Sequence, residues 1–449
     1  MDTVHFIGIG GAGMSAIAKV MLERGVRISG SDLKRSRAAA MLEAMGAIVQ
    51  IGHDARNISG ATQVIVSTAI PDTNAELVAA RDAGLPVLTR GQALAEVLAG
   101  GRSIVVAGTH GKTTTTSMIV TILRASGVDP TYLVGAGLND VGTNARSGRG
   151  ELAVAESDES DGSFLLLEPS IAVVTNVEPD HLDHWGSYEA MRAGFRGFLE
   201  RAREIVVVPV EERSLTAGLG GGVRAVTFGD GGDIWAEGGR PLAKGAGFTL
   251  CTGTDRVEVR MNVRGRHNIW NALAAAGACI QVGVPLDEIG EGLERFRGVE
   301  RRFQIRGEVA GVTVIDDYAH HPTEIAATLE AARPGPWRRL IAVFQPHRYS
   351  RTAALHGDFG AAFNEADRIV VTEVYGAGEQ PVPGVTGKLV ADAICERIPG
   401  RGVAFLPHRE DLLLYLRGNV RPGDAVLTLG AGDIHTVGEE LLETASEPP

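Results

Sequence analysis

Two glycine-rich loops constrain the fold of this chain more than any other feature of its sequence. One lies in "VHFIGIGGAGMSAIAKV" and the other in "VVAGTHGKTTTTSM", and each follows an apolar run and precedes a helix-like run. A buried strand that turns through glycines into a helix is typical of parallel α/β sheets, where the N–H groups of the helix N-terminus bind phosphate. The sequence therefore predicts two phosphate-binding α/β units in one chain.

The first loop matches the G-x-G-x-x-G spacing and begins at Gly8. Asp32 ends the next predicted strand about 20 residues later, where its carboxylate can accept a hydrogen bond from a ribose hydroxyl. The pattern describes a diphosphate joined to a ribose, so it suits a nicotinamide dinucleotide and a UDP-sugar equally well. A glycine-rich turn without any ligand is the third interpretation.

The second loop is a shortened phosphate loop. Gly108 lies three positions before Gly111, and Val106 occupies the position where the usual pattern has its first glycine. Backbone N–H groups from Gly108 onward can form an anion nest, Lys112 can reach the outer phosphates, and the hydroxyl of Thr113 can ligate Mg²⁺. A threonine-rich helix start without a ligand is the alternative. The favoured ligand is a nucleoside triphosphate, which a simple dehydrogenase does not use.

The chain of 449 residues is too long for one core, and at about 150 residues per domain it predicts three domains. Strand and helix patterns alternate throughout, so we expect three consecutive α/β domains. These are a Rossmann-like domain over 1–98, a central P-loop ATPase-type domain over 99–297, and a C-terminal Rossmann-like domain over 298–449. Short β-type runs inside the glycine-rich stretch 218–247 predict hairpins there.

Composition excludes several classes of protein. The net charge of −12 argues against nonspecific binding of nucleic acid or anionic membranes. The three cysteines lie far apart and show no metal-ligand spacing, which predicts a reduced, intracellular protein without a disulfide framework. No run approaches about 18 uninterrupted apolar residues, and the first residues lack a signal-peptide pattern. We therefore expect a soluble, cytoplasmic protein.

Two acidic segments follow predicted strands of the central domain. In "AVAESDESDGSF" Glu156 stands just past a strand end, and in "TNVEPDHLDHWG" His181 stands past the next one. Open α/β sheets bind ligands at the carboxyl ends of their strands, and these donors suit the Mg²⁺ that accompanies ATP. Acid-rich loops that are merely solvated are the alternative.

Nine segments together resemble one family, the Mur ligases. In order from residue 4 to about 435 they are "HFIGIGGAGMSAIA", "GTHGKTTTT", "ESDESDGSFL", "TNVEPDHLDHWG", "GRHNIWNALAA", "RRFQ", "DDYAHHPTEI", "FQPHRYSRT" and "GAGDI". The resemblance also accounts for the shortened phosphate loop, which Mur ligases share with folylpolyglutamate synthetases. It implies an ADP-forming amide ligase of peptidoglycan precursor synthesis that uses ATP and Mg²⁺. The expected reaction joins L-alanine to the lactyl carboxylate of UDP-N-acetylmuramate through an acyl phosphate, so one glycine loop holds the UDP-sugar and the other holds ATP.

The resemblance implies roles for individual residues. The expected catalytic residues are Lys112, Glu156, His181, Arg302 and Asp317. The expected metal ligands are Thr113, Glu156 and His181. The residues expected to bind ATP are Gly108, Thr109, His110, Gly111, Lys112, Thr113, Thr114, His267, Asn268 and Asn271. The residues expected to bind the other substrates are Gly10, Gly11, Ala12, Gly13, Met14, Ser15, Asp32, Ser67, Thr68, His320, His347, Arg348 and Arg351.

Several of these roles have a simpler structural alternative. Asp317 stands at a strand end and can cap the following helix, and His267 opens a helix in the same polar manner. The arginines of "FQPHRYSRT" offer a bidentate fork to carboxylates, although a solvated loop would need no partner. Phe195 stands where several Mur ligases carry a carbamylated lysine, which leaves the coordination of a second metal open.

Three other functions compete with this hypothesis. The first is the related murein peptide ligase, which acts on UDP-N-acetylmuramate with a peptide and differs in the "FQPHRYSRT" stretch. The second is a nicotinamide-dependent dehydrogenase, which the first glycine loop and Asp32 support. The third is a noncatalytic nucleotide-gated binding protein, which would retain its function without Lys112.

Overall fold

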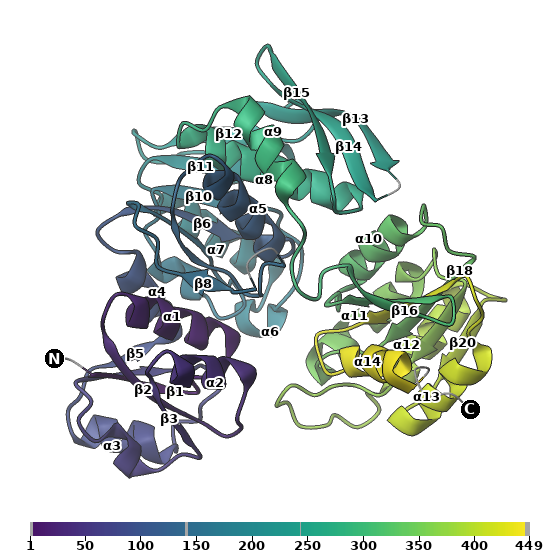
Figure 1. The fold of residues 1–449 in the computed structure, drawn as a ribbon, viewed down its shortest axis with the longest axis horizontal. Coiled ribbons are helices and arrows are strands. Elements are labelled where there is room, and N and C mark those ends of the chain that lie inside the picture. The colour runs from purple at the N-terminus through teal and green to yellow at the C-terminus, as the bar shows by residue number, and fades with distance from the viewer. Residues whose placement is uncertain (1–2, 140–141, 243, 445–449) are drawn as a thin grey trace. The chain divides into compact units, whose positions relative to one another are not determined.

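The computed structural model describes residues 3–139, 142–242 and 244–444, in which strands and helices alternate and form three sheets (Figure 1). These residues group into two compact units. The first unit comprises Met1–Gly238, Phe248–Val259 and Trp270–Arg297. The second unit comprises Gly239–Gly247, Arg260–Ile269 and Gly298–Pro449.

The first sheet is a doubly wound parallel sheet with the order β3-β2-β1-β4-β5. Its strands are β1 Thr3–Ile7, β2 Arg27–Asp32, β3 Ile48–Ile51, β4 Gln63–Val66 and β5 Val87–Thr89. Its helices are α1 Ala12–Glu23, α2 Arg37–Ala44, η1 Ala55–Ile58, α3 Ala75–Asp82 and α4 Arg90–Leu98. The winding reverses between β1 and β4, and the first glycine loop begins where β1 ends, which is where such sheets bind ligands.

The second sheet has ten strands in the order β15-β14-β13-β12-β11-β10-β6-β9-β7-β8. Its strands are β6 Arg102–Ala107, β7 Thr131–Leu133, β8 Ala145–Arg146, β9 Leu152–Glu156, β10 Ile171–Val174, β11 Ile205–Pro209, β12 Arg224–Phe228, β13 Ile234–Leu242, β14 Gly245–Thr252 and β15 Asp255–Met261. Its helices are α5 Lys112–Ala125, η2 Ser163–Leu166, α6 Leu182–Trp185, α7 Tyr188–Glu200, η3 Val210–Thr216, α8 Arg266–Gln281 and α9 Leu286–Arg295. Because β6 pairs in parallel with both β9 and β10, the carboxyl ends of these three strands meet at one edge of the sheet. Three of the strands, β13 to β15, lie in and just after the stretch predicted to form hairpins.

The third sheet has the order β16-β17-β21-β18-β19-β20, in which only the β16–β17 pair is antiparallel among the pairings described. Its strands are β16 Gln304–Val309, β17 Val312–Asp317, β18 Arg339–Phe344, β19 Arg368–Val371, β20 Gly402–Phe405 and β21 Asp424–Leu429. Its helices are α10 Pro322–Ala332, α11 Tyr349–Ala362, α12 Gly387–Arg397, α13 Arg409–Asn419 and α14 His435–Thr444. Two separate clusters of buried apolar side chains involve its strands and helices.

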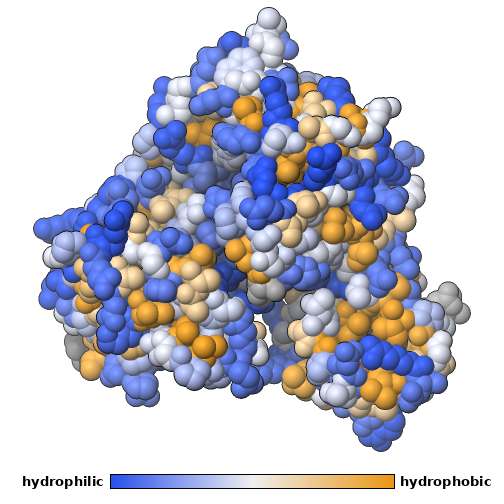
Figure 2. Space-filling view, turned by 180° about the vertical axis from the view of Figure 1, so that it is seen from behind, coloured by the Kyte–Doolittle hydropathy of each residue, from blue (hydrophilic) through white to orange (hydrophobic). Residues whose placement is uncertain are grey.

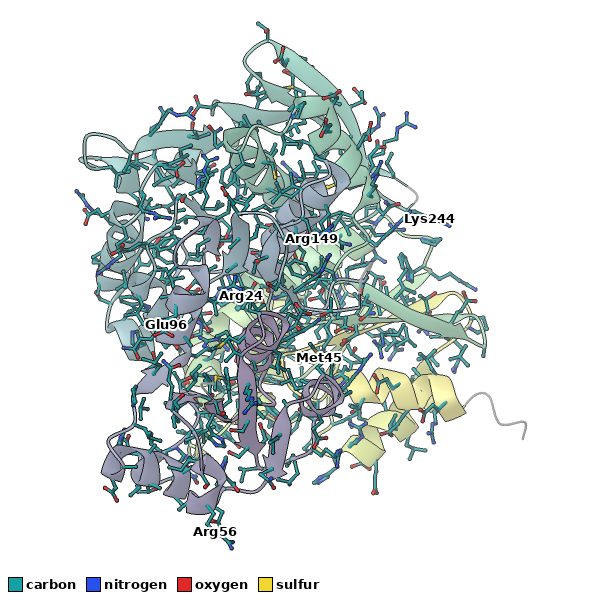
Figure 3. The ribbon with its side chains drawn as sticks, turned by 60° about the vertical axis from the view of Figure 1, so that its left-hand side comes forward. Arg24, Met45, Arg56, Glu96, Arg149 and Lys244 are labelled. Carbon is teal, nitrogen blue, oxygen red and sulfur yellow. The ribbon has the colours of Figure 1, made fainter. Side chains whose placement is uncertain are left out.

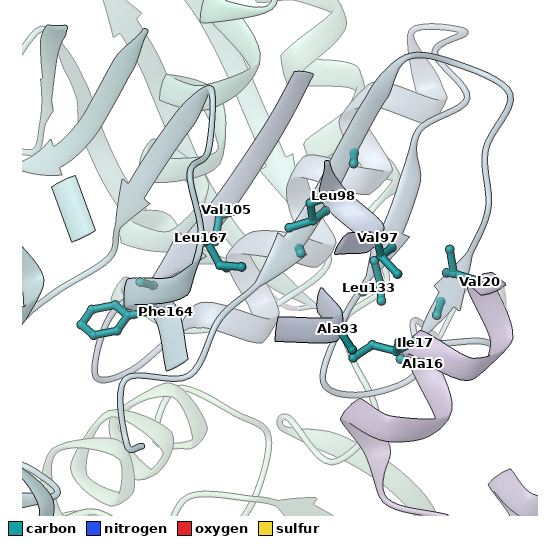
Figure 4. Close-up of a cluster of buried hydrophobic side chains, with 14 of the residues drawn as sticks. Ala16, Ile17, Val20, Ala93, Val97, Leu98, Val105, Leu133, Phe164 and Leu167 are labelled. Atoms are coloured by element: carbon teal, nitrogen blue, oxygen red, sulfur yellow. The ribbon is translucent and has the colours of Figure 1, made fainter. Parts of the chain in front are cut away.

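The first two sheets share one apolar core, which explains why they fall in the same compact unit. Figure 4 shows Ala16 and Ile17 of α1 beside Ala93 of α4, and the same cluster continues through Leu133 of β7 to Val105 of β6. Burial of apolar surface contributes roughly 25 cal/mol per Å², so a continuous core strongly opposes separation of the two sheets.

The surface carries polar and apolar side chains interspersed over the face seen in Figure 2. Within the described part of the chain, no helix is long and apolar enough to cross a membrane. The predicted α/β fold class with three domains is confirmed. The boundaries placed after residues 98 and 297 remain predictions.

Candidate functional site

The second glycine loop connects β6 to α5 and is held by the segment that follows β10. His110 N donates to Asn176 Oδ1 (2.9 Å), and His110 O accepts from Asn176 Nδ2 (2.9 Å) and Thr175 Oγ1 (2.6 Å). A side chain at Gly108 would overlap Thr175, and Gly111 adopts a φ of 80°, which favours glycine. The loop conformation therefore depends on both its own glycines and a neighbouring strand end.

Lys112 is held at this loop as a partly buried cation. Its Nζ donates to Gly108 O (2.6 Å) and to Glu159 Oε2 (2.7 Å). Burial lowers the pKa of Lys112, but the nearby carboxylates of Glu159 and Asp158 outweigh this effect and raise it. Burial raises the pKa of Glu159 to about 7, against the opposing ammonium of Lys112. The charged amine thus already lies among oxygen acceptors of the kind that phosphate would supply.

Thr113 and Glu156 face the same small space beside Gly135, which follows β7. A Cβ atom on Gly135 would overlap Glu156 Oε1 and would lie 3.4 Å from Thr113 Oγ1. A hydroxyl and a carboxylate converging on a space that only glycine leaves open fit the oxygen ligands that Mg²⁺ prefers. Sequence reasoning missed Gly135, whose only local signal is a glycine after a short apolar strand.

His181, in the loop before α6, lies near the carboxylate of Glu159 that also contacts Lys112. Its backbone has a φ of 53°, and its Nε2 lies 3.5 Å from Asp180 Oδ2 and 4.0 Å from Glu159 Oε1. Glu159 therefore lies close to both Lys112 and His181. It belongs to the "ESDESDG" segment, but nothing in that segment distinguished it from the neighbouring acids.

Of the three predicted nucleotide residues of α8, the structure brings Asn271 to the phosphate loop. A side chain at Gly111 would overlap Asn271 Oδ1, which also accepts from Thr115 Oγ1 (3.4 Å). His267 and Asn268 belong to the second compact unit, where Asn268 Nδ2 donates to Arg264 O (2.7 Å).

The other two threonines predicted to bind ATP, Thr109 and Thr114, are largely buried. Thr109 Oγ1 donates to Glu178 O (3.2 Å), and Glu178 N donates back to Thr109 Oγ1 (2.9 Å). Thr114 lies in the first turn of α5 and is buried. Thr109 thus ties the loop to the chain after β10, while Thr114 packs against the interior.

The first glycine loop is held by the end of β2. Gly8 N and Ile9 N donate to Ser31 O (2.9 and 3.0 Å), and Gly10 N donates to Asp32 Oδ2 (2.9 Å). Helix α1 then begins after Gly11 without a side-chain cap and without an acidic residue in its first turn. The positive end of the helix is therefore open to an anion, and Asp32 shapes the loop in addition to any contact with a ribose.

The other predicted residues of this loop divide into buried and exposed groups. Met14 and Ser15 are each 2% exposed, and Ser15 Oγ donates to Ala12 O (3.1 Å). Their side chains thus pack inside the domain, and only their backbone can face a ligand. Ser67 lies against Gly8, while Thr68 is exposed beyond the end of β4.

In the second unit, several predicted residues form one cluster around Tyr318. The guanidinium of Arg302 lies 5.3 Å from the Tyr318 ring, and the Tyr318 and His320 rings are 5.5 Å apart. The His347 ring lies 5.6 Å from His320, and Arg351 Nη1 lies 3.4 Å from His347 Nδ1. Tyr318 was missed, although it stands inside the quoted "DDYAHHP" segment.

Asp317 does not cap the following helix α10, whose N-cap is His321; its carboxylate accepts hydrogen bonds from two loop N–H groups instead. One of its oxygens accepts from Phe303 N (2.8 Å) and the other accepts from Ala319 N (2.7 Å). Burial raises the pKa of Asp317 to about 6, and the charge of Arg302 opposes the shift. The carboxylate thereby holds the turn that carries Arg302, and the alternative that Asp317 caps the next helix is wrong because His321 fills that position.

Two histidines of this cluster are neutral near pH 7. Burial lowers the pKa of His320 to about 4, with Glu324 opposing the shift. Burial and the charge of His320 lower the pKa of His347 to about 3. Arg348 lies at the edge of the cluster, where its Nη1 is 3.9 Å from Glu379 Oε1. The positive charge offered to a carboxylate ligand therefore comes from the arginines.

Three protein-family models match almost the whole chain. The Mur ligase family catalytic domain matches residues 3–102, the Mur ligase middle domain matches 106–279, and the Mur ligase glutamate ligase domain matches 301–432. The chain belongs to the Mur ligase family. This confirms the resemblance inferred from the nine segments.

Relatives of this Mur ligase resemble it over their full length. It is 51% identical over 445 residues to UDP-N-acetylmuramate–L-alanine ligase of Rubrobacter xylanophilus, covering 98% of this chain and 99% of the relative. The enzyme of the same name from Saccharopolyspora erythraea is 47% identical over 457 residues, covering 98% and 93%. The crystal structure of UDP-N-acetylmuramate-alanine ligase MurC from Thermotoga maritima has a TM-score of 0.85 at 31% identity and 99% coverage of both chains. A murein peptide ligase from Psychrobacter arcticus has a TM-score of 0.74 at 25% identity, covering both chains completely.

Proposed function

We propose that this Mur ligase joins L-alanine to the lactyl carboxylate of UDP-N-acetylmuramate and converts ATP to ADP and phosphate. The observation that carries the proposal is the presence in one compact unit of two different glycine loops, each leading into a helix whose N-terminus has no side-chain cap. Relatives that share the whole length of the chain bear the name of this activity. A sugar nucleotide bound at the first glycine loop and a nucleoside triphosphate bound at the second would account for the presence of both loops.

The reaction requires the carboxylate to be activated, because a carboxylate is a poor acyl donor. The lactyl oxygen attacks the γ-phosphorus of ATP, and ADP leaves. The amine of L-alanine, as the free base, then attacks the acyl carbon, phosphate leaves with the electron pair of the broken C–O bond, and the nitrogen loses one proton to the departing phosphate or to solvent. Charge that builds up on the transferring phosphoryl group must be offset by fixed positive groups.

The chain supplies those groups from the phosphate loop. Lys112 is held within hydrogen-bonding distance of Gly108 O and Glu159, and its ammonium would move to the outer phosphates of ATP. Thr113 and Glu156 would hold Mg²⁺ beside Gly135, and the ion would offset further charge on the phosphoryl oxygens. Asn271 would contact the nucleotide next to Gly111.

The second unit would orient the carboxylates and the attacking amine. Arg351 is buried beside His347 and offers a planar fork that suits a carboxylate. Arg302 would offer its guanidinium to the γ-phosphate from the turn that Asp317 holds through Phe303 N. His320 and His347, which are neutral, can exchange hydrogen bonds with substrate without adding charge.

The direct test is release of ADP and phosphate by the purified chain. We expect release only when UDP-N-acetylmuramate, L-alanine and Mg²⁺ are all present, with a product whose mass equals that of UDP-N-acetylmuramate plus one alanine residue. Parallel reactions with serine, glycine and an L-alanyl-γ-D-glutamyl-meso-diaminopimelate peptide would measure selectivity. Absence of ADP with the complete mixture, or release only with the peptide, would overturn the proposal.

A further inference from the structure

One short loop of the central sheet contacts the second glycine loop directly and contacts Arg90, which lies against the helix that follows the first glycine loop. This acidic loop, residues 157–162, connects β9 to η2. On one side Glu159 accepts from Lys112 of the second glycine loop (2.7 Å). On the other side Asp158 and Asp161 both face Arg90, the first residue of α4.

Arg90 lies between the acidic loop and the first turn of α1. Its Nη2 is 3.4 Å from Asp158 Oδ2 and 3.3 Å from Asp161 Oδ2, and its side chain is 26% exposed. A Cβ atom on Gly13 would lie 3.1 Å from Arg90 Cδ and 3.2 Å from its Nη1. The two ends of the guanidinium thus face different neighbours, with Nη2 toward the carboxylates and Nη1 toward the helix that begins at the first glycine loop.

The packing around Arg90 is close and leaves its backbone little room to move. A Cβ atom on the next residue, Gly91, would lie 2.8 Å from Ser163 Cβ and 3.0 Å from Leu166 Cδ1, so α4 packs closely against η2. Steric contact therefore fixes the start of α4 relative to the end of the acidic loop.

The acidic loop is also braced from within. Ser160 N donates to Asp158 Oδ1 (3.0 Å), and Ser163 N donates to Asp161 Oδ1 (3.0 Å). Each carboxylate therefore has one oxygen bonded to the loop backbone and its other oxygen directed at Arg90. The position of the Arg90 side chain and the conformation of the loop that carries Glu159 therefore depend on each other.

We propose that Arg90 binds the diphosphate of the sugar nucleotide through Nη1 while its Nη2 holds the acidic loop. A ligand in the first glycine loop thereby affects the position of Lys112 in the second glycine loop, through the contact of Lys112 with Glu159. The identities of the two ligands rest on the proposed function. A guanidinium has five N–H donors in a rigid fork, so it can serve a phosphate and a carboxylate at once. Coupling of this kind is reciprocal: each ligand strengthens binding of the other by the same factor.

The test measures binding by isothermal titration calorimetry with the full chain, using UDP-N-acetylmuramate, UDP and uridine as probes. For Arg90→Ala we expect Kd to rise about tenfold (~1.4 kcal/mol) for UDP-N-acetylmuramate and UDP. Binding of uridine, which lacks the diphosphate, should stay unchanged. Arg90→Lys keeps the charge without the fork and should recover only part of the affinity. The matched control is Arg56→Ala, because Arg56 is 89% exposed at the outer surface of the same domain (Figure 3).

The coupling is measured by repeating the titrations with a saturating nonhydrolysable ATP analogue. In the wild type the analogue should tighten UDP-N-acetylmuramate about fivefold or more, and in Arg90→Ala this factor should fall toward one. Asp161→Asn keeps Arg90 and should reduce the coupling factor with little change in the Kd of UDP.

Two results would overturn the inference. One is an Arg90→Ala variant that has the melting temperature of the wild type and binds UDP-N-acetylmuramate with the same Kd. The same conclusion follows if Arg90→Ala raises the Kd for uridine by the same factor as the Kd for UDP-N-acetylmuramate. The other is a coupling factor that neither Arg90→Ala nor Asp161→Asn alters. A wild type that fails to bind UDP-N-acetylmuramate at all would instead count against the proposed function, so the two failures are distinguishable.

Discussion

Replacing Gly135 by alanine should separate folding from catalysis in this protein. The added Cβ would overlap Glu156 Oε1 and lie 3.4 Å from Thr113 Oγ1. Glu156 can relieve the overlap because the clashing atom is the far end of its side chain. Gly135 also has no left-handed φ among those described. The fold should therefore accept alanine at this position.

The expected change in stability is small, and the expected change in rate is large. A glycine replaced by alanine at a compatible φ gains about 0.4 to 1 kcal/mol through the unfolded state, which offsets the cost of moving one flexible side chain. A normal carbon–oxygen contact requires the Glu156 carboxylate to shift by roughly 1 Å, and a misplacement of about that size can lower a rate by about 10²-fold. We expect a melting temperature near that of the wild type and a kcat about 100-fold lower, with a higher Mg²⁺ requirement.

The assay compares ADP release against Mg²⁺ concentration for Gly135→Ala, the wild type and Gly418→Ala. Gly418 lies in α13, and a Cβ atom added there would meet no atom within 4 Å, so alanine at that position should leave activity unchanged. A Gly135→Ala enzyme with wild-type kcat and Mg²⁺ dependence would refute the assignment of Thr113 and Glu156 to a common metal site.

Other substitutions test the two phosphate loops and the histidine cluster. Lys112→Ala should lower turnover by about 10²- to 10³-fold in the ADP-release assay, because it removes the cation at the phosphate loop and leaves Glu159 buried without that ammonium. Asp32→Asn should raise the calorimetric Kd for UDP about fivefold and leave binding of an ATP analogue unchanged, because it weakens the hydrogen bond that holds the first glycine loop. The folded-state pKa values of His320 (about 4) and His347 (about 3) lie below the ordinary value of 6.5, so the unfolded chain binds more protons than the folded chain between pH 6.5 and 4. The free energy of unfolding, measured by urea melts, should therefore fall as the pH is lowered from 6.5 toward 4. The expected slope is up to about 1.4 kcal/mol per pH unit for each histidine. His347→Asn should reduce that slope; an unchanged slope would contradict the reasoning.

Local signals were sufficient to predict the strand and the helix on either side of each glycine loop. The apolar run before the second glycine loop was predicted as a strand and forms β6, and the run after that loop was predicted as a helix and forms α5. Both patterns arise from side-chain periodicity and from glycines placed where the chain turns, which neighbouring residues determine among themselves. Family membership could be recognised for the same reason, since each motif is a short local string.

Contacts between distant residues could not be predicted in this way. Glu159 is 47 residues from Lys112, and several acids of the same segment would have satisfied the charge pattern equally well. Gly135 meets Glu156 and Thr113 only because β7, β9 and β6 are neighbours in the sheet. Which side chain faces the site depends on packing, and no local pattern records it.

The α/β domains and the two glycine-rich turns between strand and helix could be predicted from the amino-acid sequence, because strand period, glycine at left-handed φ and helix N-termini are properties of short segments. The hydrogen bonds of Asp317 to Phe303 N and Ala319 N, the pairing of Glu159 with Lys112 and the place of Arg90 between the acidic loop and α1 arise only once the chain has folded. These contacts depend on which buried polar groups become neighbours when the sheets assemble. An unpaired buried charge costs several kcal/mol, so each buried charge must find a partner in the folded chain.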